Sequence, residues 1–218
     1  MEEGFFYRRR LLYITWLICL MVGAFVVLKT NKGDTILYLN GFYNQWTVPV
    51  FSFFTRMGEW AGFVIPFLYF MFFKPIKYQL GFVLVGLSTL ILVYFFKHIV
   101  YPDTLRPIVY FELHNIELLN RSEIPLNRKH TFPSGHTTAG FAYFFYAALC
   151  AKHRLFTLTF FCIGFMIGFS RIFLAQHFVV DVVAGSTLGV AIATTVYFYV
   201  IYRNGFKAPF LDKKLFNG

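Results

Sequence analysis

The chain consists largely of long apolar runs separated by short polar or basic segments. Several runs approach or exceed the length of about 20 residues that a helix needs to cross the hydrocarbon core of a bilayer. The pattern therefore predicts an all-α, integral membrane bundle of six transmembrane helices, built as a single domain over residues 1–218. The expected helices are 11–28, one within 48–73, 80–96, 134–151, 155–169 and 182–202.

Two of these runs leave a choice open. The first follows Arg8–Arg10 and has no small-residue cleavage site behind it, which favours a retained helix over a signal peptide. The second is interrupted by Arg56 and Glu59, which are three residues apart and could face each other on a helix. Either its helix starts near Arg56, or residues 48–54 form a separate interfacial helix.

Composition agrees with a membrane protein. The chain is 58% hydrophobic and 14% charged, with a mean hydropathy of +0.60. Its net charge of +10 does not indicate nucleic-acid binding, because the basic residues lie between apolar runs rather than along one stripe. Cys19, Cys150 and Cys162 lie inside apolar runs without metal-ligand spacing, so we expect neither a metal site nor another cofactor.

The basic residues predict the orientation in the membrane. With the N-terminus inside, the inner segments hold 11 basic residues against three acidic ones, whereas the outer segments hold nine against seven. Cytoplasmic loops are enriched in lysine and arginine, so both termini are expected in the cytoplasm of a multi-pass cell (inner) membrane protein. The inner basic residues are Arg8, Arg9, Arg10, Lys74, Lys77, Lys152, Arg154, Arg203, Lys207, Lys213 and Lys214.

Three polar clusters are expected at one membrane face, which this orientation makes the periplasmic or exterior face. About 33 mostly apolar residues separate the second cluster from the third, with a basic break at residues 152–154, so two helices leave the face and return to it. Convergence of basic and histidine side chains there predicts an anion site, with phosphate as the expected anion. The clusters are Lys97 with Arg106-Pro107; Pro133-Ser134-Gly135-His136; and Ser170-Arg171 with His177 and Asp181.

The second cluster stands where a polar loop becomes a helix. A helix start offers unpaired N–H groups that suit phosphate, Ser134 adds a hydroxyl, and Gly135 permits close approach of the backbone. Taken alone, Ser134 could equally be an ordinary N-cap. Arg171 and Lys97 could likewise be interface anchors, although the planar guanidinium also fits phosphate oxygens.

His177 and Asp181 are four residues apart and are expected on one helix face. A carboxylate bonded to one ring nitrogen fixes the tautomer and directs the other nitrogen outward, as a nucleophile or base requires. Two ligands of a metal site, or a buried polar pair without a function, are the alternatives. No further ligands follow at a spacing typical of metal sites.

The ordered set of motifs resembles the type 2 phosphatidic acid phosphatase superfamily. The resemblance rests on Pro133-Ser134-Gly135-His136, on Ser170-Arg171-x5-His177-x3-Asp181, and on the preceding Lys97 and Arg106-Pro107. It covers residues 80–202. One departure is the spacing of the first motif: eight residues separate Lys97 from Arg106 instead of six, and the expected position holds Ile99. Either the loop bulges near Pro102, or Lys97 contacts phosphate differently.

The resemblance implies a metal-independent phosphatase that acts through a phosphohistidine. It implies His177 as nucleophile, Asp181 as the residue that orients it, and His136 as general acid and then base. The remaining groups would hold the phosphate oxygens: Lys97, Arg106, Ser134, Gly135 and Arg171.

The expected substrate is a lipid phosphate whose tails lie in the bilayer, with membrane lipids as surroundings and no nucleic acid as partner. Undecaprenyl diphosphate, lipid A, phosphatidic acid and phosphatidylglycerophosphate are the candidate classes; the oligomeric state is left open. A non-catalytic lipid-phosphate binding or transport protein with the same fold is the alternative. Vanadate-dependent haloperoxidases share this phosphate cradle, but they are in general large soluble proteins. This chain is small and membrane-embedded, so haloperoxidase chemistry is not expected. The long polar loop 101–132 is a candidate for headgroup contact.

Overall fold

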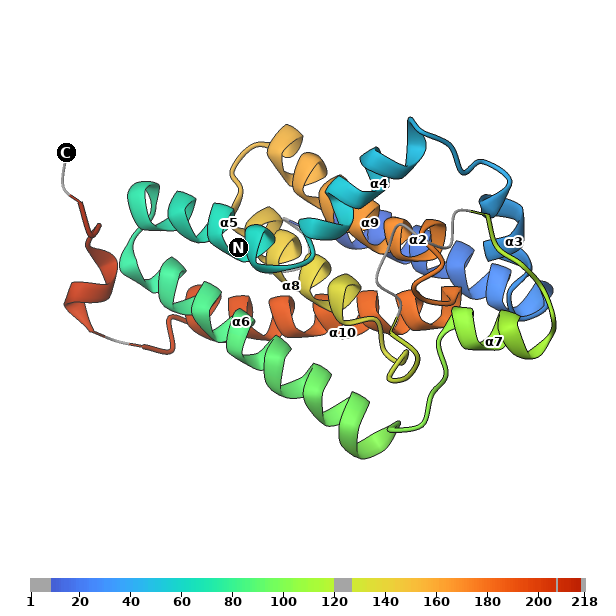
Figure 1. Cartoon of the computed structure of the whole chain (residues 1–218). Coiled ribbons are helices and arrows are strands. Elements are labelled where there is room, and N and C mark those ends of the chain that lie inside the picture. Colours follow the sequence, from blue (N-terminus) through green and yellow to red (C-terminus); the bar gives the residue numbers. More distant parts are fainter. Residues whose placement is uncertain (1–8, 120–126, 207, 217–218) are drawn as a thin grey trace.

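The computed structural model describes residues 9–119, 127–206 and 208–216, and it is helical throughout apart from two isolated β-bridges within this part of the chain (Figure 1). The α-helices are α2 (Arg10–Lys29), α3 (Asp34–Asn40), α4 (Thr47–Arg56), α5 (Trp60–Phe73), α6 (Ile76–Phe95), α7 (Pro107–Leu113), α8 (Gly135–Cys150), α9 (Arg154–Phe173) and α10 (Val179–Tyr197). The π-helical turns η1 (Phe96–Val100) and η2 (Phe198–Tyr202) extend α6 and α10, and η3 (Pro209–Asp212) is a 3₁₀ turn.

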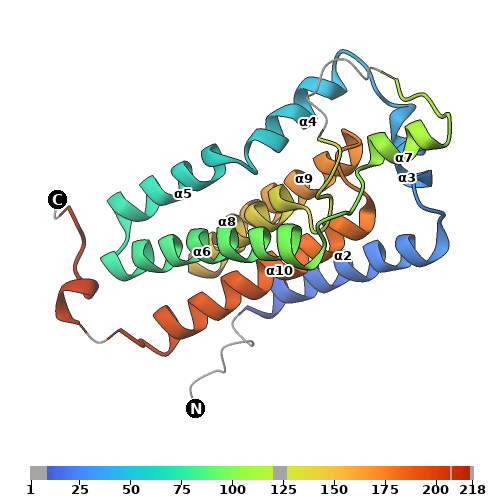
Figure 2. The ribbon, with the colours of Figure 1, turned by 60° about the horizontal axis from the view of Figure 1, so that its bottom comes forward.

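Helix α8 is the centre of the bundle. It packs against α10, α9, α6 and α5, and nearly all of its residues are buried (Figures 1 and 2). Close contact with α10 depends on glycine: a Cβ at Gly189 would lie 2.5 Å from the carbonyl oxygen of Thr138, a backbone atom that cannot rotate away. Tyr146 and Phe145 of α8 fill the interior and are almost completely buried.

Within the part of the chain that the structure describes, four helices are long and apolar enough to cross a membrane. They cover Arg10–Lys29, Ile76–Val100, Arg154–Phe173 and Val179–Tyr202, and α5 is a shorter apolar helix. Large apolar side chains cover the outside of α2, where Met21, Phe25 and Leu28 are more than 60% exposed. Lipid contact explains such a surface, because the bilayer interior is the apolar solvent that these side chains require. The protein is therefore a helical membrane protein.

Several helix boundaries differ from the expected ones. The 48–73 region is two helices, α4 and α5, divided at residues 57–59, so the alternative with a separate helix is the one observed, although this helix continues to Arg56. Arg56 and Glu59, which could have faced each other on one helix, do not share a helix: Glu59 lies in the break and hydrogen-bonds His136. Helix α10 starts at Val179, which places Asp181 within its first turn.

The two ends of the bundle carry different chemistry. The start of α8, the end of α9, the start of α10 and the η1–α7 connection meet at one end, on the right in Figure 1. At the other end, the C-terminal segment packs on the α5–α6 turn through a Lys77–Asp212 ion pair of 2.7 Å and stacking of Phe72 on Phe216. The expected orientation in the membrane was based on a count of charged residues. Six of them lie outside the described residues: Glu2, Glu3, Arg8, Arg121, Glu123 and Lys207.

Candidate active site

All eight residues that the sequence nominated lie at the same end of the bundle. Ser134 is the N-cap of α8, followed by Gly135 and His136 in its first turn. Arg171 is in the last turn of α9, His177 is in the α9–α10 connection, and Asp181 is in the first turn of α10. Lys97 lies in η1, and Arg106 is the N-cap of α7. His177, Arg171, Arg106, Asp181 and Ser134 are each at most 6% exposed.

The start of α8 faces Lys97. A Cβ built at Gly135 would lie 3.7 Å from the Lys97 ammonium, so the two groups are neighbours although the spacing of the first motif departs from the usual one. The longer segment is accommodated by the π turn η1 and an extended loop, and Ile99 is 63% exposed. Lys97 therefore lies at the start of α8 despite the longer segment, and how it would contact a phosphate stays a prediction.

Ser134 is the N-cap of α8. Its Oγ accepts from the backbone N–H and the hydroxyl of Thr137, at 3.4 and 2.8 Å, which is the geometry of a helix N-cap. Its own hydroxyl hydrogen is left to donate. Its backbone N–H donates to the Asp181 carbonyl at 3.1 Å and ties α8 to α10.

His177 is connected to Asp181 through Thr131. The Thr131 hydroxyl donates to Asp181 Oδ2 at 2.6 Å and lies 3.1 Å from His177 Nδ1, whereas Nδ1 and Oδ2 themselves are 3.4 Å apart. Because a threonine has one hydroxyl hydrogen and Asp181 receives it, Thr131 can only accept from His177. His177 is therefore protonated on Nδ1, and its buried Nε2 is a lone-pair atom that makes no hydrogen bond with the described residues.

The expectation that His177 and Asp181 share a helix face is wrong. Helix α9 ends at Phe173, the chain turns through Ala175 at a φ of 51°, and α10 starts only after its N-cap Phe178. The two side chains meet because the Asp181 carboxylate bends back over the start of its own helix, accepting from the Phe178 N–H at 2.9 Å. A carboxylate at this position also interacts favourably with the positive end of the helix.

Burial lowers the pKa of His177 well below its ordinary value, and the positive charge of Arg171 adds to this effect. The imidazole is therefore neutral at pH 7, which is the form that can attack an electrophile. Burial also lowers the pKa of Arg106, against the opposing effect of Asp181. Positive charge held in a buried site without a matching carboxylate for each cation favours binding of an anion.

A glutamine joins the two arginines. Gln176 Oε1 accepts from Arg106 and Arg171, at 3.3 and 3.4 Å, and the side chain is buried. Its Nε2 and the Arg171 Nε are buried donors without a hydrogen-bond partner among the described residues. Buried donors rarely stay unpaired in proteins. Their position between the arginines is consistent with a site completed by a bound oxyanion.

Two residues near the α4–α5 break, Thr55 in the last turn of α4 and Glu59 in the break itself, contact motif residues. Thr55 Oγ1 accepts from the Arg171 guanidinium at 2.7 Å and lies 3.0 Å from Ser170 Oγ. Glu59 Oε1 lies 3.1 Å from His136 Nε2. Thr55 and Glu59 therefore hydrogen-bond motif residues, although neither belongs to a motif.

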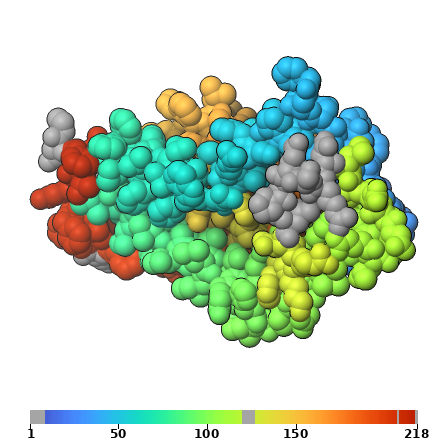
Figure 3. Space-filling model, viewed as in Figure 1, coloured from blue at the N-terminus to red at the C-terminus, as the bar shows by residue number. Residues whose placement is uncertain are grey.

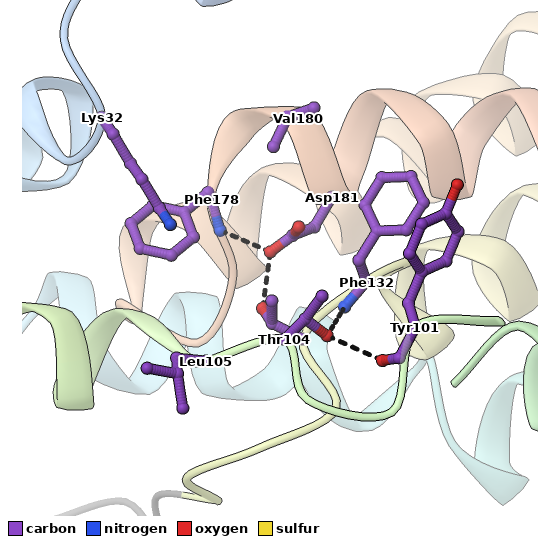
Figure 4. A pocket seen from close by; sticks show the side chains of 9 residues that line it. Lys32, Tyr101, Thr104, Leu105, Phe132, Phe178, Val180 and Asp181 are labelled. Atoms are coloured by element: carbon purple, nitrogen blue, oxygen red, sulfur yellow. Dashed lines mark hydrogen bonds between the residues drawn. The ribbon is translucent and has the colours of Figure 1, made fainter. Parts of the chain in front are cut away.

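A pocket of about 320 Å³, lined in part by Thr131 and Asp181, opens beside the site (Figure 4). Phe178, Phe132 and Leu105 give it apolar walls, and the Lys32 ammonium lies over the Phe178 ring, 4.6 Å from its centroid. Thr104, Thr131 and Tyr101 of the polar loop line the same pocket, so this loop contributes to the surface around the site.

Four contributing residues were not predicted from the sequence: Thr55, Glu59, Thr131 and Gln176. Thr131 and Gln176 are each adjacent to a recognised motif, three residues before Ser134 and one before His177, so their proximity was the available signal. In the sequence, Glu59 stands out only because it interrupts an apolar run. No set of three or more His, Cys, Asp or Glu side chains arranged to hold a metal ion occurs within residues 9–119, 127–206 and 208–216.

The sequence from residue 77 to 205 matches the family model of the PAP2 superfamily. Since the match covers more than half of the 218 residues, the chain belongs to this superfamily. The resemblance to the type 2 phosphatidic acid phosphatases is thereby confirmed. No curated protein matches the sequence.

Two solved structures have a similar fold. LpxE from Aquifex aeolicus aligns with a TM-score of 0.62 and 22% identity, over 77% of this chain and 95% of LpxE. A transmembrane PAP2-type phosphatidylglycerolphosphate phosphatase from Bacillus subtilis aligns with a TM-score of 0.56 and 19% identity, over 93% of this chain and 99% of the other. At these identities, the likeness defines the fold.

Proposed function

We propose that the protein is a metal-independent lipid phosphate phosphatase that hydrolyses a phosphomonoester or pyrophosphate bond through a phosphohistidine on His177. The observation that carries the proposal is the buried, Nδ1-protonated His177, whose free Nε2 lies in a site with Lys97, Arg106 and Arg171. Membership of the PAP2 superfamily supports it, as does the fold shared with LpxE and with a transmembrane PAP2-type phosphatidylglycerolphosphate phosphatase.

In the first step, His177 Nε2 attacks phosphorus, and the bond to the lipid oxygen breaks. His136 gives its proton to this oxygen, while the imidazolium that forms on His177 is stabilised by Asp181 through Thr131. In the second step, His136 takes a proton from water, the hydroxide attacks phosphorus, and phosphate leaves His177.

Three cationic groups and three neutral donors would stabilise the transition state. Charge spreads over the three equatorial oxygens of the transferred group, and preorganised donors at those oxygens are what such a site must supply. Lys97, Arg106 and Arg171 contribute the positive charges. Ser134 contributes its hydroxyl and Gly135 its backbone N–H, and Gln176 contributes its amide and keeps the two arginines together.

The membrane arrangement supports a lipid substrate. Six transmembrane helices, with α5 and α8 added to the four long spans, would place both termini in the cytoplasm and the site at the periplasmic or exterior face of the cell membrane. A lipid would then keep its tails in the bilayer and present its phosphate at the interface. The pocket lined by Lys32, Tyr101 and Thr104 is the space that we assign to the substrate headgroup.

The test is phosphate release by the detergent-purified protein in the presence of EDTA. The panel consists of undecaprenyl diphosphate, lipid A, phosphatidic acid and phosphatidylglycerophosphate, with His177→Ala as the matched control. Release that survives EDTA and disappears in the variant supports the proposal, and the best substrate identifies the lipid class. Binding of these lipids without release from any of them would favour a non-catalytic binding or transport protein.

A further inference from the structure

The break between α4 and α5 packs directly on the start of α8. A Cβ at Gly58 would lie 3.0 Å from His136 Cβ and 3.1 Å from the His136 carbonyl oxygen, so the absence of a side chain at this position favours the close approach. Glu59 follows as the N-cap of α5, and its carboxylate reaches His136 Nε2 at 3.1 Å. In the space-filling view, the α4–α5 segment (cyan) and α6 (green) cover most of α8 (yellow) on this face (Figure 3).

His136 is surrounded by positive charge. Its ring is largely buried, Arg171, Lys97 and Arg106 act on it electrostatically as well, and His177 is a further titratable neighbour. Such surroundings disfavour the protonated ring that a general acid needs before it can release its proton. Among the described residues, Glu59 supplies the carboxylate that contacts the His136 ring, whereas Asp181 is engaged by Thr131 and the Phe178 N–H.

The contact also decides which ring nitrogen faces the reaction. The Glu59 carboxylate is hydrogen-bonded to Nε2. Because an ionised carboxylate can only accept, Nε2 carries the hydrogen. Nδ1 makes no hydrogen bond with the described residues and is the atom left for the leaving oxygen.

We propose that Glu59 is the positioning residue of the general acid and base, holding His136 by Nε2 and stabilising its protonated form. This inference rests on the proposed phosphatase function and adds to it a residue outside the three motifs. In the first step, the Nδ1 proton of His136 moves to the lipid oxygen as the P–O bond breaks. The Nε2–H group stays hydrogen-bonded to the Glu59 carboxylate. In the second step, Nδ1 takes a proton from water, which restores the charged pair.

The experiment compares Glu59→Gln and Glu59→Asp with Arg56→Gln. Arg56 is the matched control because it is exposed, belongs to the same segment, and is not part of the site. Two substrates separate acid catalysis from general damage: a lipid monophosphate, whose alkoxide needs a proton, and p-nitrophenyl phosphate, whose leaving group does not. The readouts are kcat on the lipid across pH and the burst rate of p-nitrophenol release in a single turnover.

For Glu59→Gln we expect kcat on the lipid to fall about 10- to 100-fold, with a change in the p-nitrophenol burst of less than about threefold. The alkaline limb of the pH profile of kcat on the lipid should move to lower pH by about one unit. A nearby carboxylate favours the protonated imidazole, and Glu59→Gln removes it. Glu59→Asp should recover part of the rate, and Arg56→Gln should behave as wild type.

Equal losses on both substrates, or an unmoved alkaline limb in a folded Glu59→Gln variant, would overturn the assignment and leave the phosphatase function intact. Thermal unfolding of each variant shows whether it is folded, and Glu59→Asp provides the second test if Glu59→Gln is not. A wild-type protein that releases no phosphate from either substrate would overturn the proposed function and this inference with it.

Discussion

Thr131 provides the sharpest test of the proposed machinery, because it lies between the nucleophile and the carboxylate that orients it. Thr131→Val keeps the shape of the side chain and removes the hydroxyl that donates to Asp181 and accepts from His177 Nδ1. The direct distance of 3.4 Å between Nδ1 and Oδ2 leaves Asp181 close enough to retain part of the orientation.

The size of the effect follows from the bonds that are lost. A hydrogen bond to a charged group contributes about 1.5–3 kcal/mol, and this one joins a buried carboxylate at 2.6 Å. Some of this loss is recovered if Asp181 moves onto Nδ1. We therefore expect kcat/KM to fall by about 10- to 100-fold, or ~1.4–2.7 kcal/mol of transition-state stabilisation. Thr131→Ser, which keeps the hydroxyl, should stay within about threefold of wild type.

A double-mutant cycle separates this relay from a direct contact. If Asp181 acts through Thr131, then Thr131→Val adds little to the loss already caused by Asp181→Asn, because both remove the same support of His177. The assay is initial-rate phosphate release from the best lipid of the panel, with folding followed by thermal unfolding. Wild-type activity in Thr131→Val, or fully additive losses in the double variant, would refute the relay.

Three further predictions concern the surroundings of the site. Gln176→Met, which removes the oxygen shared by the two arginines, should weaken inhibition by vanadate about tenfold; an unchanged inhibition constant would exclude the contribution to oxyanion binding. The pKa of His177 is lower in the folded than in the unfolded chain, so the unfolded chain takes up the proton first and stability falls as pH drops below about 6.5. The melting temperature should therefore fall less between pH 7 and 5 in His177→Gln than in wild type, and equal slopes would contradict this. Gly189→Ala should destabilise the protein by about 1–3 kcal/mol because its Cβ would meet the Thr138 carbonyl, seen as a lower melting temperature in detergent, whereas Gly41→Ala, which has room, should not.

The sequence predicted those features that depend on local pattern. Apolar runs of membrane-spanning length gave the helical class, and the polar residues at their ends gave the positions of the eight site residues. The prediction succeeds because helices that leave and re-enter one face bring their end residues together whatever their detailed packing. The same logic explains why Lys97 reaches Gly135 although its distance from Arg106 along the chain is unusual.

The features that the sequence did not predict depend on contacts between distant segments. Glu59 reaches His136, 77 residues away, only because Gly58 lets the α4–α5 break approach α8. Thr131 and His177 are likewise brought together by tertiary packing rather than by spacing. The expectation that His177 shares a helix with Asp181 failed because a left-handed turn at Ala175 ends α9 before the histidine.

The central claim is that His177 carries the phosphoryl group during turnover. The most direct measurement is a single turnover of the preferred lipid phosphate, quenched into alkaline denaturant, in which phosphohistidine survives, followed by mass spectrometry of the peptides. We predict a phosphoryl group on His177 that appears and decays at rates compatible with turnover and is absent from His177→Ala. A phosphoryl group on another residue, or full phosphate release by the His177→Ala variant, would contradict the mechanism.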